Sequence, residues 1–216
     1  MRRGPNLLLV LLIGAVAVCA ACEQTPPAGY AKSIDRGKVL YDTCVPCHRQ
    51  DGHGRIDVAA PSIAGLQKWY VKSQLQKFRK DLRGAHPKDT AGIRMRAISK
   101  ALQSEAAIES VAAYVDSMKP LDPPTTLEGD PEKGKTLYQP CKACHGPKGG
   151  GKKALKAPAL THSQDWYLYK QIQHFQDGVR GYSPKDTTGT QMAGLASSLP
   201  DDQAVRDVIA YIQTFK

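Results

Sequence analysis

Cys44-Val45-Pro46-Cys47-His48 is a Cys-x-x-Cys-His stretch, and the pattern returns as Cys141-Lys142-Ala143-Cys144-His145. This pattern is the attachment signature of c-type haem. The two cysteines of a stretch lie on one short turn, where both thiols can add to the two vinyl groups of one porphyrin. The histidine that follows is then held beneath the iron as its proximal ligand. The two stretches therefore predict two covalently bound haem c groups. The predicted attachment residues are Cys44, Cys47, Cys141 and Cys144, and the predicted proximal iron ligands are His48 and His145.

A zinc site is the main alternative, because two Cys-x-x-Cys pairs can together supply four thiolates. That interpretation leaves both adjacent histidines unexplained, together with two methionines that match across the halves of the chain. A thioredoxin-like redox pair is weaker still, since it expects a strand–helix–strand setting that the sequence pattern does not show. Haem attachment accounts for more of the pattern.

The chain is an internal duplication, because the haem motif and its surroundings repeat at an offset of 97 residues without a gap. Such a repeat predicts two copies of one small domain. Matched pairs include Tyr41/Tyr138, Pro61/Pro158, Trp69/Trp166, Phe78/Phe175, Arg83/Arg180 and Met95/Met192.

The repeat also divides the chain into segments. We expect the two domains over residues 34–119 and 132–216. Residues 120–131 contain four prolines and no apolar periodicity, which predicts a stiff linker. Residues 1–22 are predicted to be a signal peptide, and residues 23–33 a flexible tether to the first domain.

The leader begins with a short basic segment and continues as an apolar run over residues 7–21, too short for a membrane span. Two interpretations of its end stay open. Cleavage after Ala20 would release a soluble protein. Alternatively, Val18-Cys19-Ala20-Ala21-Cys22 resembles a bacterial lipobox, and a lipidated Cys22 would then anchor the protein to a membrane. Haem attachment of this type takes place outside the bacterial cytoplasm, so both interpretations place the protein in the periplasm.

Each half has a helical pattern, with apolar residues on one face of each segment. Ser104 and Asp201 are helix-capping residue types at matching positions. The fold class we expect is all-α, with two tandem domains that each wrap around one haem. The predicted helices cover residues 35–41, 67–80 and 104–119 in the first half, and 132–138, 164–177 and 201–216 in the second.

Met95 and Met192 are the candidates for the second axial ligand of each iron. Each follows the first cysteine of its motif by 51 residues, in a Gly-x-x-Met segment that we expect to form a loop before the last helix. A thioether is a soft, neutral ligand that raises the reduction potential of a haem. A single methionine here would more simply be a core residue, but the match across the repeat favours ligation.

Histidine is a less favoured second ligand, because the remaining histidines have no histidine at the matching position in the other half. We expect all four of them to be exposed: His53, His86, His162 and His174.

Three further pairs have open roles. The carbonyls of Pro61 and Pro158 are candidates to accept a hydrogen bond from the proximal histidines, although each proline could equally just form a turn. Trp69, Trp166, Arg83 and Arg180 could bind haem propionates, or the tryptophans could lie in the core and the arginines on the surface.

The chain has 30 Lys and Arg against 20 Asp and Glu, a formal net charge of +10. Residues 30–119 hold 16 basic against 9 acidic residues (+7), and residues 120–216 hold 12 against 10 (+2). No basic run with interleaved aromatic residues is present, so nucleic-acid binding is not expected. A basic surface favours an acidic redox partner or an anionic membrane face, and the first half is predicted to dock the more acidic partner.

Each half resembles a class I cytochrome c domain, and the tandem pair resembles the dihaem cytochrome c4 family. The resemblance rests on both Cys-x-x-Cys-His motifs, on the matched methionines and on the segment from Met192 through Tyr211. It implies two helical domains with facing haem propionate edges that carry electrons towards a terminal oxidase. The expected partners are redox proteins: a terminal oxidase, a bc1-type complex or a periplasmic dehydrogenase.

The resemblance implies an electron carrier in a respiratory chain and not an enzyme. The alternative is a dihaem peroxidase, which needs one haem with an open distal site. Matched methionines argue against an open iron, and no acid–base residue can be placed over one.

Overall fold

The computed structural model describes Met1, Gly29 and residues 32–215, and within this part of the chain it has ten α-helices and no β-strand. The predicted all-α fold is confirmed. The predicted signal peptide, Cys22 and most of the tether lie outside the described residues. Among those described, no helix is long and apolar enough to cross a membrane.

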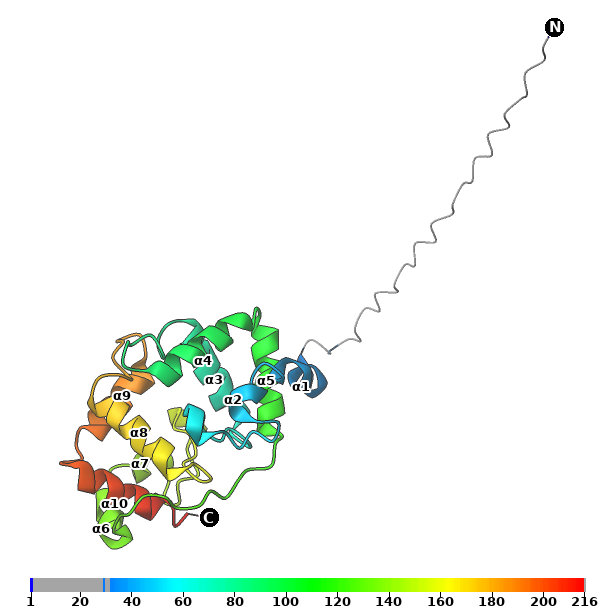
Figure 1. The fold of residues 1–216 in the computed structure, drawn as a ribbon. Helices are drawn as coiled ribbons and strands as arrows, with labels where there is room; N and C mark the ends of the chain where they lie inside the picture. Colours follow the sequence, from blue (N-terminus) through cyan, green and yellow to red (C-terminus); the bar gives the residue numbers. More distant parts are fainter. Residues whose placement is uncertain (2–28, 30–31, 216) are drawn as a thin grey trace.

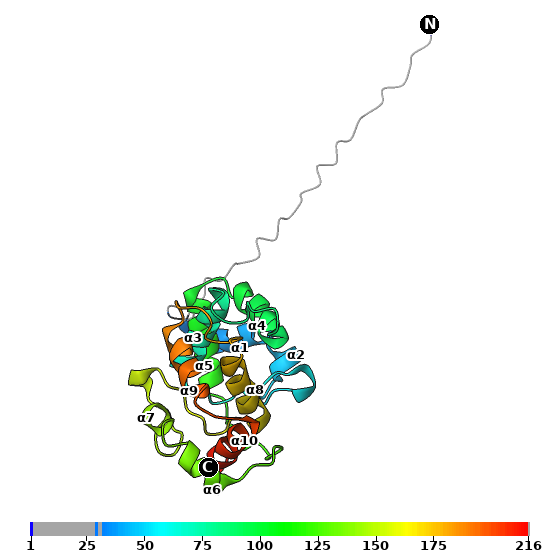
Figure 2. The ribbon, with the colours of Figure 1, turned by 90° about the vertical axis from the view of Figure 1, so that its left-hand side faces the viewer.

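The helices form two sets in the same order, the first domain (α1–α5) and the second domain (α6–α10) (Figure 1). In both views α6 and α10 lie together at the end of the molecule opposite α4 (Figures 1 and 2). The first domain contains α1 Ile34–Tyr41, α2 Val45–His48, α3 Lys68–Arg79, α4 Thr90–Ala101 and α5 Glu105–Asp116. The second contains α6 Pro131–Leu137, α7 Lys142–His145, α8 Asp165–Gln176, α9 Thr187–Ala196 and α10 Asp202–Ile212.

The six helices predicted from sequence are all present, within a few residues of the expected bounds. Ser104 and Asp201 are the caps of α5 and α10, since their side chains accept from the backbone N–H of Ala107 (3.1 Å) and Ala204 (2.8 Å).

The expectation of a loop at the Gly-x-x-Met segments is wrong, because both segments lie inside helices α4 and α9. Each helix is started by a buried aspartate, Asp89 or Asp186, whose carboxylate accepts from the N–H of a glycine three residues later at 2.8 or 2.9 Å. A Cβ atom on Gly92 would lie 2.0 Å from Asp89 Oδ2. The glycine thus makes room for the cap and does not end the helix.

The first and last helices of each domain cross at a glycine. A Cβ atom at Gly37 of α1 would lie 2.1 Å from the Ser110 carbonyl oxygen of α5, and one at Gly134 of α6 would lie 1.9 Å from that of Asp207. The close crossing lets α5 and α10 form the centre of each core, where Ile108 and Val208 are fully buried.

The linker packs against the second domain. Asp165, fully buried at the start of α8, accepts hydrogen bonds from the backbone N–H of Thr126, from the Thr126 hydroxyl (2.8 Å) and from the N–H of Leu127 (2.8 Å). The N–H of Asp130 donates to Asp207 Oδ1 at 2.8 Å. These bonds fix the path of the chain between the domains.

Replacing Asp165 with alanine is expected to lower the free energy of unfolding by about 2 kcal/mol, because linker donors lose a charged acceptor. Urea unfolding of the haem-loaded protein measures this. Asp177→Ala, at an exposed position just after the same helix, is the control and should change stability by less than about 0.5 kcal/mol. Equal effects of the two substitutions would contradict the role given to Asp165.

Candidate haem-binding sites and the domain interface

Each Cys-x-x-Cys-His motif forms a single short helix. In α2 the His48 N–H donates to the Cys44 carbonyl at 2.8 Å, and in α7 His145 donates to Cys141 at 2.9 Å. All four motif cysteines are half-buried and unpaired with one another. One turn of backbone thus carries both thiols and the imidazole, as attachment to one porphyrin requires.

The proximal histidines are buried, with exposed fractions of 4% for His48 and 7% for His145. Their Nδ1 atoms lie 2.9 Å from the carbonyl oxygens of Pro61 and Pro158. A carbonyl only accepts, so Nδ1 carries the proton and the Nε2 lone pair is left for another ligand. Nothing in the described part of the chain bonds to either Nε2. The prolines are therefore orienting groups and not merely turn residues.

Burial lowers the pKa of both His48 and His145, while the proline carbonyls act in the opposite direction. Lowering the pKa favours the neutral imidazole, which is the form that binds a metal. A buried neutral histidine with its tautomer fixed by a carbonyl fits a haem iron.

In each domain one tyrosine hydrogen-bonds to the residue that follows the motif histidine. The two tyrosines match across the repeat, but the sequence analysis gave them no role. Tyr41 donates to the Arg49 carbonyl (3.1 Å) and Tyr138 to that of Gly146 (2.8 Å). Both acceptors have a positive φ, 63° at Arg49 and 83° at Gly146, which turns the chain sharply after the histidine. Burial raises the pKa of Tyr138 to about 12, so its hydroxyl remains a donor.

The structure brings each candidate axial methionine to the core that also contacts its motif. Met95 on α4 is half-buried and packs against the same hydrophobic cluster as Cys44, and Met192 on α9 packs against the same cluster as Cys141. Ligation by the two sulfur atoms stays a prediction.

The two Cys-x-x-Cys pairs do not converge. Among the described residues no group of three or more His, Cys, Asp or Glu side chains is arranged to hold a metal ion. A Cys₄ zinc site is thus not formed.

The expectation that the other four histidines are exposed is wrong for three of them. Only His162 is exposed, while His53 and His86 are half-buried. His174 is buried, at 7% exposure, because it lies on α8 where the two domains meet.

The surface interpretation of the arginines is also wrong for Arg83, which is 9% exposed. Its guanidinium donates to Gln74 (2.9 Å) in its own domain, and to Gln171 (3.0 Å) and Tyr167 (2.9 Å) in the other. Arg180, half-buried, donates to Gln171 at 2.7 Å and crosses to Gln74 at 3.1 Å. Each glutamine oxygen therefore accepts from both arginines, and the contacts of one domain are repeated by the other.

The tryptophans do not lie deep in the core, since Trp69 and Trp166 are both half-buried. The indole N–H of Trp69 donates to Gln67 at 3.0 Å.

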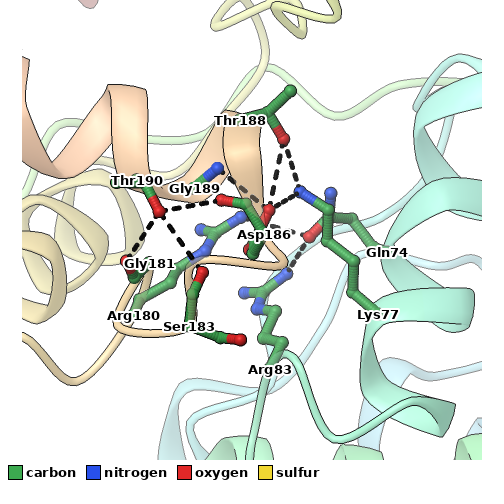
Figure 3. A network of polar contacts seen from close by, with 10 residues as sticks. All are labelled: Gln74, Lys77, Arg83, Arg180, Gly181, Ser183, Asp186, Thr188, Gly189 and Thr190. Atoms are coloured by element: carbon green, nitrogen blue, oxygen red, sulfur yellow. Dashed lines mark hydrogen bonds and ion pairs between the residues drawn. The ribbon is translucent and has the colours of Figure 1, made fainter.

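A second pair of contacts at the interface is related by the same repeat but differs in chemistry. Lys77 Nζ on α3 lies 2.6 Å from Asp186 Oδ1 and also donates to Thr188 (Figure 3). The equivalent residues are His174 and Asp89, and His174 Nδ1 lies 4.0 Å from Asp89 Oδ1. One domain supplies a lysine where the other supplies a histidine.

His174 is expected to make stability depend on pH. Burial lowers its pKa, Asp89 opposes this, and the cations Lys170, Arg83 and Arg180 add to it. Below the unfolded-state pKa of about 6.5, His174 binds a proton in the unfolded chain but stays neutral in the folded protein. The contribution of His174 to the free energy of unfolding is therefore fully present above about pH 6.5 and is lost as the pH drops.

His174→Gln is expected to flatten this loss of stability between about pH 6.5 and 5. Urea unfolding of wild type and variant across that range measures it as the difference between the two curves. The same pH slope in both proteins would show that His174 is not the group responsible.

The sequence profile of the cytochrome c family matches residues 34–119 and again residues 131–216. The chain is 27% identical to cytochrome c-552 of Acidithiobacillus ferridurans over 216 residues, which cover 95% of this chain and 84% of that protein. It is 29% identical over 184 residues to a thiosulfate dehydrogenase electron acceptor of Thiomonas intermedia, covering 79% of this chain and 77% of that one.

The fold is similar to that of reduced recombinant cytochrome c4 from Pseudomonas stutzeri. The TM-score is 0.65 at 25% sequence identity, and the match covers 85% of this chain and 99% of the other. Two profile matches, two Cys-x-x-Cys-His turns and two fixed proximal histidines lead to one conclusion. The chain belongs to the cytochrome c family and carries two of its domains in tandem, each with one haem c.

Proposed function

We propose that the protein is a periplasmic dihaem electron carrier with His/Met ligation at both irons. It would pass single electrons from a respiratory-chain or dehydrogenase donor towards a terminal oxidase. The observation that carries the proposal is the repetition of the whole site, from the oriented histidine to the methionine on the helix before the last. When bound, the two haems supply the one-electron chemistry.

In this proposal, residues of the chain orient the proximal histidines and supply the second ligands of the haems. Pro61 and Pro158 hold the imidazole rings in one orientation. Met95 and Met192 would supply the second protein ligand of each haem, and an electron could then be gained or lost with little rearrangement and without a bound substrate. We propose domain limits of 34–119 and 132–216, joined by residues 120–131, behind a signal peptide over residues 1–22.

The donor we favour is a periplasmic dehydrogenase, because the Thiomonas relative is described as the electron acceptor of thiosulfate dehydrogenase. A bc1-type complex is the other candidate donor. Lipidation of Cys22 would keep the carrier at the membrane, and mass spectrometry of the purified mature protein tests this directly.

The test of the carrier function is the absorption spectrum of the haem-loaded protein, ferric and then ferrous with and without carbon monoxide. Two low-spin haems that show the sulfur–iron charge-transfer band and do not bind carbon monoxide are the expected result. A high-spin fraction, or one haem that binds carbon monoxide readily, would favour the dihaem peroxidase alternative.

A further inference from the structure

The surroundings of the two haem-attachment turns differ sharply in charge. Residues 133–164 contain seven lysines and no Asp or Glu, whereas the equivalent residues 36–67 contain four Lys or Arg and three Asp. All seven lysines are exposed. They are Lys133, Lys135, Lys142, Lys148, Lys152, Lys153 and Lys156.

Several of these lysines border the second attachment turn directly. Lys152 Nζ donates to the Ala143 carbonyl between the two cysteines at 2.7 Å, so its side chain reaches the turn itself. Lys142 belongs to the turn, and Leu155 is 51% exposed among the neighbouring lysines. We call this surface the second-motif face. It consists of Lys142, Ala143, Lys148, Lys152, Lys153, Leu155 and Lys156.

The charge of the second-motif face is not neutralised within the chain. In the part of the chain that the structure describes, no carboxylate lies within 4.0 Å of the ammonium group of any of its five lysines. Its positive field is therefore directed at solvent.

The first attachment turn has a less charged, more apolar surface. Val45, Ile56 and Ala59 stand where the second domain has Lys142, Lys153 and Lys156, and Ile56 is 63% exposed. Two of the three cations beside this turn are in ion pairs, Arg55 at 2.5 Å from Asp57 and Arg49 at 3.4 Å from Asp51. The third, exposed Arg94, donates to the Val58 carbonyl at 2.6 Å.

The larger net charge of the first domain lies elsewhere, and eight of its 16 Lys and Arg are in ion pairs. Lys68 and Lys72 both contact Glu109, and Arg96 and Lys100 both contact Asp81. Net charge by halves does not record which cations have partners, so it does not measure the charge that either attachment turn offers to another protein.

We propose that the second-motif face is the docking site for an acidic redox protein, which exchanges electrons with the second haem. The proposal rests on the carrier function and specifies where its partner binds. A rim of unpaired lysines around exposed Leu155 and Ala143 has the charged periphery and apolar centre of a transient interface. Opposite charge on the partner would raise the association rate by steering. An anionic membrane would also attract lysines, but it would not require them to surround a haem-attachment turn.

The test is stopped-flow oxidation of the reduced haem-loaded protein by plastocyanin, used as a soluble acidic blue-copper probe. The triple variant Lys148→Glu, Lys153→Glu and Lys156→Glu changes only side chains without hydrogen-bond partners in the described residues. At low salt its second-order rate constant is expected to fall about tenfold or more, and the difference should shrink at high salt.

The matched control is Lys38→Glu, Lys80→Glu and Lys119→Glu, three exposed lysines of the first domain, with the same change in net charge. Its rate constant should fall by less than about threefold at low salt, since those charges lie away from the docking site. Equal slowing of the two variants would overturn the proposal.

Two further measurements separate the remaining outcomes. If phosphatidylserine vesicles bind the wild type and not the first triple variant, while plastocyanin oxidises both equally fast, the face serves a membrane and the proposal is wrong. Oxidation by ferricyanide tests the carrier function itself. Failure of the wild type to react with ferricyanide would overturn the carrier function, whereas reaction with ferricyanide and equal plastocyanin rates would overturn only the docking site.

Discussion

Met192→Ala is expected to open the second iron to external ligands and to lower the reduction potential of that haem. The thioether is a neutral, soft ligand that favours ferrous iron, and alanine supplies no donor in its place. The fall should be on the order of 0.1 V, within the range of about 0.8 V that axial ligands span. Alanine is a strong helix former, so α9 should persist. Redox titration and carbon monoxide binding measure the two effects.

The repeat supplies the comparison for this prediction. Met95→Ala should have the same effect on the first haem alone, and the double variant should bind two equivalents of carbon monoxide. Met118 has no methionine at its repeat position and packs against the first core. Met118→Ala should therefore leave both haems unable to bind carbon monoxide. If the Met192→Ala variant does not bind carbon monoxide, the prediction that Met192 is the ligand is wrong.

Lys77→Ala is expected to lower the free energy of unfolding by about 3 kcal/mol, the cost of leaving one member of a buried ion pair alone. Asp186 is 3% exposed and Lys77 is its cationic partner from the other domain. Burial lowers the pKa of Lys77, so the aspartate is needed to keep the ammonium charged. Urea unfolding of the haem-loaded protein measures the loss, and docking of the domains should weaken with it.

Lys80→Ala is the control for this substitution, because Lys80 caps the same helix but is exposed and has no ion-pair partner among the described residues. Its effect should stay within about 0.5 kcal/mol. A loss below about 1 kcal/mol for Lys77→Ala would mean that water reaches Asp186 and compensates for the missing lysine.

The sequence was sufficient for the features that depend on local chemistry. The Cys-x-x-Cys-His turns, their repetition and the capping residues Ser104 and Asp201 predicted the haems, the two domains and the last helices. These features depend on neighbours within a few residues of the chain, so the pattern contains the information directly.

Features that depend on distant contacts could not be predicted in the same way. From the sequence, Gly92 predicts a loop, but in the structure it makes room for the capping carboxylate of Asp89. Arg83 fits a surface position from the sequence, but in the structure the second domain covers it. Lys77 and His174 are polar residues on helices whose neighbours come from the other domain. Their roles follow only from how the two domains are placed against each other.

The interface also bears on how such a chain could arise. Arg83 contacts Gln171 while Arg180 contacts Gln74, so each domain offers the other the same surface. This is the self-complementary contact that two identical subunits make about a two-fold axis. A one-domain ancestor with these residues could have paired with itself before gene duplication joined the copies. The difference between Lys77 and His174 requires two separately encoded copies, since identical subunits of one gene cannot diverge from each other.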